Sequence, residues 1–294
     1  MNTESTIWDV FYDECKADGY WHCFLFIPKN KIVFLDSLIQ QARECSNYRD
    51  PIHYTNIGRK TKNEDRRVVF IKVLTDILLY IIQQQKLDAV INWNGTTQKI
   101  NAPYVGARVA ILRMLNNHET QSIPQKLIEA TFRMAIKGPL HYLFTDEHPI
   151  IDTINVDFST SSFQNSFDES NLWERVKNEL NKNITFTPSS SITCISKKDY
   201  LPDCPFSQIM QFVDVILGSF RTCVVQNTEF VARYFASEPI RSLLLKDYKN
   251  IARMKNSRYY KGYSLTDAHL NDQWVFKPIK IENDKNQYDI FEDF

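Results

Sequence analysis

Hydrophobic and polar residues alternate near the start of the chain in a pattern that predicts a β-hairpin. Ile7–Tyr12 and Tyr20–Ile27 are short runs rich in aromatic and aliphatic residues, as strands usually are. Asp18-Gly19 lies between them, and this dipeptide is common in tight hairpin turns. We therefore expect two antiparallel strands, the first of which ends at Asp13-Glu14.

The middle of the chain alternates between helical and strand-like patterns. Apolar residues recur at helical spacing in residues 32–45, 64–85, 103–115, 124–136 and 168–180. Short apolar or alternating runs that suit strands lie at residues 87–93, 150–158, 184–186 and 192–195. Strands that alternate with helices after an opening hairpin predict an α/β fold with a mixed sheet.

Residues 206–226 predict a strongly apolar helix that carries one polar stripe. Ser207, Gln211, Asp214, Gly218 and Arg221 are spaced four, three, four and three residues apart, so they share one helix face. A solvent-exposed stripe normally carries several Lys or Glu, whereas these residues are mostly small or short. The stripe therefore predicts a face that is closely covered, and Gly218 would admit a neighbouring backbone or a substrate.

The composition changes near residues 228–240. We expect residues 1–227 to form the core, and residues 228–294 to form a helical extension that ends in an acidic tail. The tail, residues 282–294, would be disordered or would dock on a partner protein.

Composition and charge narrow the classes of function. The 294 residues carry 35 basic and 35 acidic side chains, so the net charge does not itself indicate a nucleic-acid partner. Six cysteines occur without a C-x-x-C pair, which argues against a zinc site and fits a reducing compartment. No phosphate-cradling glycine loop is present, which disfavours ATP hydrolysis and dinucleotide chemistry.

The same sequence favours a cytoplasmic protein without a membrane segment. The N-terminus lacks the basic and apolar regions of a signal peptide. The longest apolar stretch, Val68–Ile82, is interrupted by Lys72 and Asp76 and is shorter than the ~18 residues of a membrane span.

Three acids fall where the expected sheet would bring them together. Asp13 ends the first strand, Asp157 lies near the end of the strand at 150–158, and Asp214 belongs to the polar stripe. Clustered carboxylates repel each other unless a cation neutralises them, and Mg²⁺ prefers oxygen ligands. Alternatively, Asp13 and Asp157 are turn or cap residues, and Asp214 pairs with Arg221 or with another basic residue.

Several short motifs resemble domain-of-unknown-function family 3800. The run 11–15, Phe-Tyr-Asp-Glu-Cys, resembles the Asp-Glu-Ser end of the family's first strand. Ile52-His53-Tyr54 resembles a short family segment, and the run 211–218 resembles its late helix, Gln-Leu-Ala-Asp-aliphatic-aliphatic-x-Gly. The resemblance covers about residues 7–225 in order. It implies an RNase H-like fold whose acidic residues bind metal.

This chain departs from the family pattern at three places. Cys15 replaces the Ser after Asp-Glu, and Pro51 replaces a Glu that often precedes the His segment, with Asp50 one residue earlier. An RNase H-like nuclease usually needs a fourth acid. Glu14 would supply it, although strand alternation places Glu14 on the opposite face from Asp13.

The resemblance implies a metal-dependent nuclease that acts on RNA or DNA. Asp13, Asp157 and Asp214 would hold one or two Mg²⁺ or Mn²⁺ ions, and His53 or Gln211 would orient the attacking water. A setting in bacterial antiviral defence or mobile elements follows from the family alone. The alternatives are a catalytically weak or inactive RNase H-like scaffold that binds a partner protein or nucleic acid, and a purely structural protein. The alternative for His53 is a structural role without a part in catalysis.

A basic segment follows the His motif. It contains Arg59, Lys60, Lys62, Arg66 and Arg67, opposed by Glu64 and Asp65. These side chains would contact a phosphate backbone and make binding salt-dependent, or they form the solvated start of a helix.

Overall fold

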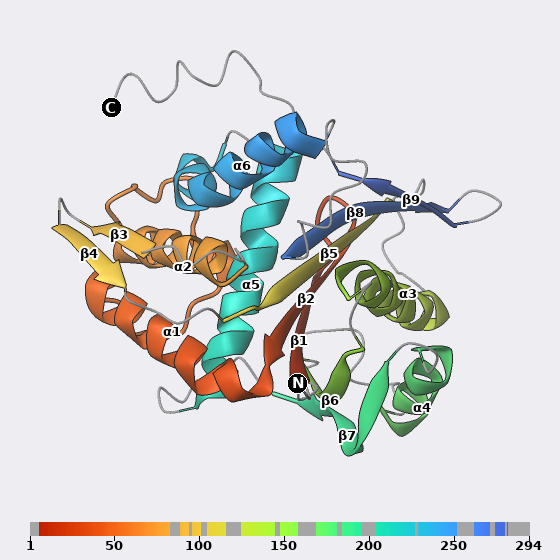
Figure 1. The fold of residues 1–294 in the computed structure, drawn as a ribbon. Helices are drawn as coiled ribbons and strands as arrows, with labels where there is room; N and C mark the ends of the chain where they lie inside the picture. Colours follow the sequence, from red (N-terminus) through yellow and green to blue (C-terminus); the bar gives the residue numbers. More distant parts are fainter. Residues whose placement is uncertain are drawn as a thin grey trace.

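A mixed sheet of seven strands forms the middle layer of the fold, which is therefore of the α/β class (Figure 1). The computed structural model describes residues 6–82, 89–93, 96–100, 105–115, 125–144, 148–157, 169–180, 184–195, 204–226, 229–251, 262–270, 274–279 and 281. The strands of this sheet are β1 (Ile7–Cys15), β2 (Tyr20–Pro28), β5 (Arg108–Leu115), β6 (Ile150–Val156), β7 (Thr185–Cys194), β8 (Tyr263–Leu270) and β9 (Trp274–Pro278).

Across the sheet the strands follow the order β7-β6-β1-β2-β5-β8-β9. The pairs β1/β2, β2/β5 and β8/β9 are antiparallel, whereas β1/β6, β6/β7 and β5/β8 are parallel. The expected hairpin turn is confirmed, because Asp18 and Gly19 both have positive φ, at 56° and 112°. The sheet therefore combines the opening hairpin with parallel crossovers, as the sequence predicts.

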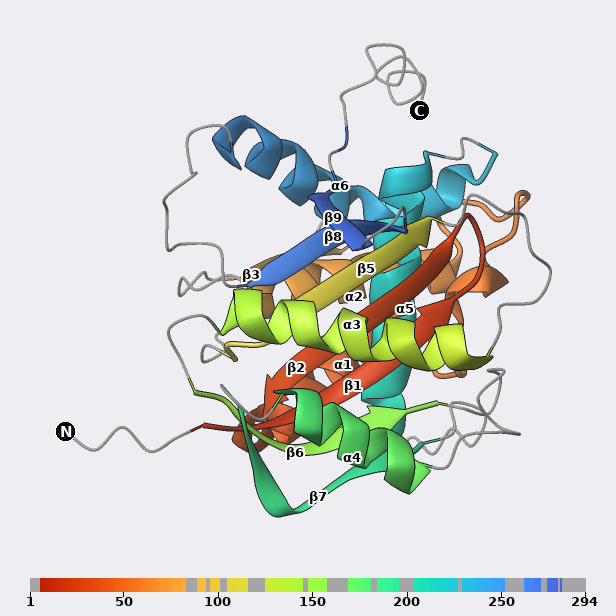
Figure 2. The same cartoon turned by 90° about the vertical axis from the view of Figure 1, so that its right-hand side faces the viewer.

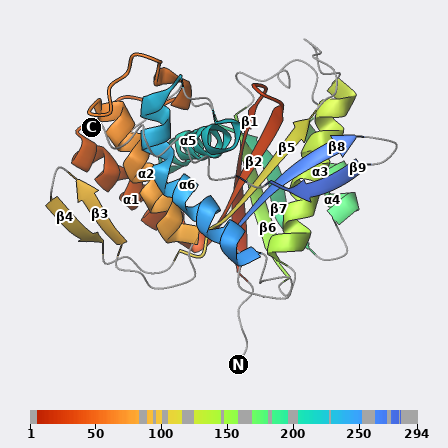
Figure 3. The same ribbon diagram turned by 90° about the horizontal axis from the view of Figure 1, so that it is seen from above.

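Helices cover both faces of the sheet (Figures 2 and 3). On one side lie α1 (Ile32–Ser46), α2 (Arg66–Ile82), α5 (Pro205–Val225) and α6 (Val231–Ile251), and on the other lie α3 (Gln125–Leu143) and α4 (Glu169–Leu180). Smaller elements are the 3₁₀ turns η1 (Lys29–Lys31) and η2 (Tyr54–Asn56) and a separate hairpin of β3 (Ala89–Trp93) and β4 (Thr96–Ile100).

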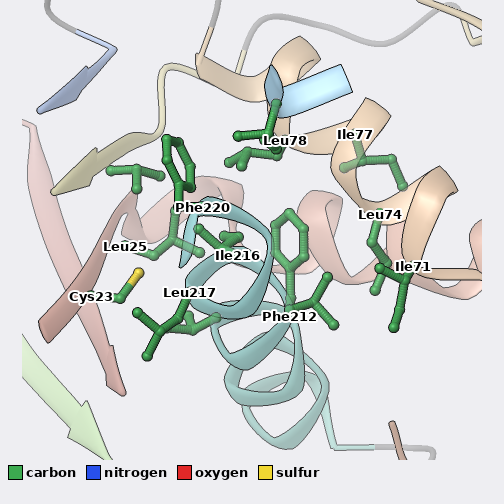
Figure 4. Packing of buried hydrophobic residues seen from close by; sticks show 14 of the residues in the cluster. Cys23, Leu25, Ile71, Leu74, Ile77, Leu78, Phe212, Ile216, Leu217 and Phe220 are labelled. Carbon is green, nitrogen blue, oxygen red and sulfur yellow. The ribbon is translucent and has the colours of Figure 1, made fainter. Parts of the chain in front are cut away.

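The two faces of the sheet contribute to two hydrophobic clusters. Phe11 of β1 packs in the cluster formed with α1, α2 and α5, whereas Val10 and Tyr12 belong to the cluster on the α3 side. Figure 4 shows α5 at the centre of the first cluster, where Phe212 and Ile216 lie among side chains of α2 and β2. Among the described residues α5 is the helix long and apolar enough to cross a membrane, and 78% of its most apolar stretch is buried inside the fold. It packs as a core helix.

The expected helix at residues 103–115 is wrong, because Arg108–Leu115 forms the strand β5. Val109 and Ile111 face the α5 side, while Ala110, Leu112 and Met114 face the α3 side. A strand buried on both faces is an almost continuous apolar run, and its periodicity does not distinguish it from a helix. The two short strands expected at 184–186 and 192–195 are parts of the single strand β7.

The boundary expected at residue 227 does not separate a helical appendage from the core. The helix α6 is present, and it packs against α2 and α5. After it, β8 pairs along its length with β5 and so extends the central sheet. The extension is therefore a mixed α/β segment that completes the sheet. The acidic tail expected at residues 282–294 lies outside the described residues.

His22 on β2 gives the fold a testable pH dependence. The side chain is buried, its Nδ1 lies 2.9 Å from the Tyr12 hydroxyl, and burial lowers its pKa from 6.5 to about 3. Below pH 6.5 the His22 side chain therefore becomes protonated in the unfolded chain, whereas in the folded chain it stays neutral down to about pH 3. The contribution of neutral His22 to the free energy of unfolding is complete above the pKa that His22 has in the unfolded chain. Below that pKa it declines by up to ~1.4 kcal/mol per pH unit.

The variant His22→Gln isolates this effect, because glutamine keeps a polar partner for Tyr12 but does not titrate. Urea unfolding between about pH 7 and pH 4 should show a steeper loss of stability for the wild type than for the variant. Parallel pH profiles would show that His22 is not held neutral by the fold.

Candidate active site

Asp13 and Asp157 lie side by side on neighbouring parallel strands. Tyr12 of β1 is the register partner of Val156 of β6, and Asp13 and Asp157 are the next residues of the two chains. Tyr12 and Val156 both face the α3 side, so alternation turns the next residue of each strand toward α5. Adjacent strands are about 4.8 Å apart. Both carboxylates are buried, at 5% and 6% exposure.

Asp214 approaches the same region from α5, which packs against β1. Burial raises the pKa of the Cys15 thiol, and the negative charges of Asp13 and Asp214 add to this effect. Cys15 follows Asp13 by two residues and lies on the same face of β1. The thiol is therefore near both carboxylates, and Asp214 belongs to the surroundings of the strand end that carries Asp13.

The polar stripe of α5 binds the segment that carries His53. Gln211 Oε1 accepts the Ile52 N–H at 2.8 Å, and Asp214 Oδ2 accepts the Tyr54 N–H at 2.7 Å. These amides are two residues apart in an extended segment, and their acceptors are three residues apart on one helix face. The expectation that this face is closely covered is confirmed, and the covering group is the chain at residues 52–54.

Gly218 completes this contact by admitting the side chain of Tyr54. A Cβ atom at Gly218 would lie 2.2 Å from Cγ and 2.8 Å from Cβ of Tyr54. The Tyr54 hydroxyl lies 2.7 Å from Thr222 Oγ1 and 2.8 Å from Ser237 Oγ, which ties the loop to α5 and α6. Gly218 thus permits the close approach that the sequence suggested, and the group that approaches is the Tyr54 side chain of the same chain.

His53 is oriented by Asp214. Its side chain is half exposed, and its Nδ1 lies 3.2 Å from Asp214 Oδ2 and 3.2 Å from Thr55 Oγ1. A carboxylate at one ring nitrogen fixes the orientation of an imidazole and leaves the other nitrogen for proton transfer. The sequence named both residues, but it did not show that they meet.

Arg43 is a site-supporting residue that the sequence analysis missed. Its guanidinium is buried, and it donates to Gln208 Oε1 at 2.7 Å, to Gln211 Oε1 at 3.2 Å and to the Asp50 carbonyl at 2.9 Å. It therefore fixes the chain just before His53. The available signal was an arginine beside Ala42 on the apolar face of α1.

Glu14 and Arg221 lie apart from the acidic pair. Glu14 is on the α3 face, where the hydroxyls of Tyr12 and Tyr20 donate to its Oε2. Strand alternation thus separates it from Asp13, as expected. Arg221 pairs with Asp18 at 2.6 Å, so the Asp214–Arg221 pair considered from the sequence is not formed.

The basic residues occupy the loop after η2 and the start of α2. Arg59, Lys60 and Lys62 lie in the loop, and Arg66 and Arg67 are the first residues of the helix. The segment begins six residues after His53. It is thus a neighbour of the His53 segment in the chain and contributes no side chain to the acidic pair.

Carboxylate oxygens are suitable ligands for a hard divalent cation, and Asp13 and Asp157 supply them from adjacent strands. Within the described parts of the chain, no three His, Cys, Asp or Glu side chains form a group that could hold a metal ion. Asp214 Oδ2 is engaged by the Tyr54 amide and faces His53. The pair fits a metal such as Mg²⁺, which commonly takes one or two protein carboxylates and keeps several waters.

No protein-family model matches the chain, and a search of curated proteins finds no relative.

Proposed function

We propose that this chain is a metal-dependent nuclease or nuclease-like protein of RNase H-like fold, which hydrolyses phosphodiester bonds of RNA or DNA. The observation that carries the proposal is the pair of buried carboxylates, Asp13 and Asp157, at the same level of two parallel strands. The late helix α5 adds Asp214 on the same side of the sheet. An acid on a central strand and another on a late helix match what the family resemblance implies.

Asp13 and Asp157 would hold one divalent cation, Mg²⁺ or Mn²⁺, through carboxylate oxygens. Such an ion supplies charge stabilisation to a phosphodiester and acidifies water. The two strands contribute position, because Asp13 belongs to the ladder between β1 and β2, and Asp157 directly follows the last β6 residue that pairs with β1. A rigid scaffold of this kind keeps ligand geometry without a large ordering cost.

In this proposal Asp214 and Gln211 position the segment at residues 52–54, and His53 acts as a general base toward the attacking water. Asp214 orients His53, and the imidazole accepts a proton from the attacking water. Gln211 Oε1 already accepts from Ile52 and Arg43, so it positions the loop and does not orient water. This assignment gives Asp214 a positioning role in place of the metal-ligand role expected from the sequence.

A second candidate is an RNase H-like scaffold without activity that binds a partner protein or nucleic acid. It is favoured by the position of Glu14, which lies on the α3 face and therefore does not supply the fourth acid that the family resemblance calls for. For either candidate, the scattered cysteines favour a reducing, cytoplasmic compartment. The family resemblance alone suggests a setting in bacterial antiviral defence or mobile elements.

The test is cleavage of labelled single- and double-stranded RNA and DNA by the purified chain. We expect cleavage of at least one substrate with Mg²⁺ or Mn²⁺, and loss of cleavage when a chelator removes the ion. Cleavage that persists in chelator would contradict a metal-dependent reaction. Failure to cleave every substrate with either ion would reject the nuclease and support the scaffold.

A further inference from the structure

A cavity that is widely open to solvent lies beside the His53 segment and is lined by the basic loop. Its volume is about 570 Å³, and its lining residues are Asn56, Gly58, Lys60, Thr61, Lys62, Glu64, Asp65 and Arg67. All of these residues are polar, charged or glycine. A base or another apolar group would find no aromatic surface to stack on. The lining suits a hydrated, charged ligand.

The five basic residues of this region are not equivalent. Arg59 pairs with Glu229 at 2.6 Å and lies over the ring of Phe230, and Arg67 pairs with Asp65 at 2.6 Å. These two arginines therefore have structural partners. Lys60 and Lys62 are exposed, and no carboxylate of the described residues pairs with either.

The charges that line the cavity leave a local excess of positive charge. Asp65 is neutralised by Arg67, whose side chain and backbone N–H both donate to its carboxylate. The remaining charged side chains of the lining are one carboxylate, Glu64, and two ammonium groups, Lys60 and Lys62. Because Asp65 already caps the first turn of α2, the cationic side chains, and not the helix end, would attract an anion.

The cavity is joined to the candidate active site through a short, fixed piece of chain. The Asn56 N–H donates to the His53 carbonyl at 2.9 Å, and Arg67 donates to the Asn56 carbonyl at 3.2 Å. Arg233 of α6 donates to the Ile57 carbonyl at 2.8 Å. The wall of the cavity is thus held in a defined position relative to His53.

We propose that this cavity binds a phosphate group of the nucleic-acid strand next to the bond at the acidic pair, with Lys60 and Lys62 as the phosphate-binding side chains. The inference rests on the proposed function, because the bound strand is taken to be its substrate. Phosphate contacts of this kind position a strand without reading its sequence. Binding is therefore independent of base sequence and weakened by salt.

The test measures binding in chelator, so that cleavage cannot interfere. Labelled single-stranded RNA and DNA of roughly 16 nucleotides would be titrated with wild type, the double variant Lys60→Ala/Lys62→Ala and the control Lys137→Ala/Lys277→Ala. The control removes the same charge from α3 and β9, and both of its lysines are exposed. Inorganic phosphate added as a competitor distinguishes a general anion site from a strand site.

We expect the Lys60/Lys62 variant to raise Kd about tenfold at low salt and to lower the slope of log K against log salt by about 0.7, the value for one lost phosphate contact on a single strand. The control should stay within about twofold of wild type. Equal binding by both double variants, or no binding by wild type, would overturn the inference. Lysine-dependent binding without cleavage in Mg²⁺ or Mn²⁺ would retain the phosphate site and reject only the nuclease. If inorganic phosphate displaces the labelled strand as effectively as an unlabelled oligonucleotide does, the cavity is a general anion site. That result would overturn its role in strand binding.

Discussion

The variant Asp13→Asn should lower metal-dependent cleavage by about 10²–10³-fold, which is the loss typical when one group that stabilises developing charge is removed. Asparagine has nearly the same shape, so the β1/β6 ladder that places residue 13 beside Asp157 is retained. What is lost is one negative charge and one ligand oxygen at a buried position. Asp157→Asn should give a loss of similar size for the same reason.

Glu14→Gln is the matched control for this prediction. Glu14 is the next residue of β1, but it faces the α3 side and accepts hydrogen bonds from Tyr12 and Tyr20. The glutamine amide oxygen keeps one acceptor for these hydroxyls. Initial rates at saturating Mg²⁺ should therefore stay near wild type. If Asp13→Asn and Glu14→Gln reduce the rate equally, the α5 face of the sheet is not the active face.

Gly218→Ala should lower the free energy of unfolding by about 1–3 kcal/mol, the usual cost of added volume in a packed core. The new Cβ would lie 2.2 Å from one carbon of the Tyr54 ring and 2.3 Å from another. The ring cannot move away freely, because its hydroxyl is held by Thr222 and Ser237 and its backbone N–H is held by Asp214. Chemical unfolding measures the effect.

Gly138→Ala is the control for Gly218→Ala. Gly138 lies within α3, and a Cβ there would meet no atom within 4 Å other than those of its chain neighbours and of the helix backbone around it. This change should alter the free energy of unfolding by no more than about 1 kcal/mol, because the higher helix propensity of alanine is opposed by the poor fit of a Cβ on the residue before Pro139. The Gly218 variant should also cleave more slowly, since a displaced Tyr54 carries His53 with it. Equal stability of the two variants would contradict the close packing of Tyr54 on α5.

The elements that the sequence predicted well have strong local patterns. The β1/β2 hairpin was evident from two aromatic runs around Asp18-Gly19, and α5 was evident from its long apolar face. The strand β5 was mistaken for a helix because it is buried on both faces. The strand β8 was missed because it carries several polar residues, and its pairing with β5 joins residues about 150 positions apart in the chain. The strand β9 was missed with it, because β9 pairs with β8.

The candidate site was predictable in its residues and unpredictable in its contacts. The spacing along α5 showed that Gln211, Asp214 and Gly218 face a close neighbour. It could not show that the neighbour is the segment at 52–54, because that segment has no periodic pattern of its own. The juxtaposition of Asp13 and Asp157 depends on the register of β1 and β6, which includes a shift between Trp8 and Asp9. Register of this kind is set by tertiary packing.

Calorimetric titration of Mn²⁺ tests most directly whether Asp13 and Asp157 together bind a divalent cation. Wild type and Glu14→Gln should bind the ion with equal affinity, whereas Asp13→Asn and Asp157→Asn should each bind at least about tenfold more weakly. All four proteins should keep the same unfolding transition in chelator within about 1 kcal/mol. Equal Mn²⁺ affinity in all four, or no binding by wild type, would contradict binding of the ion by this pair.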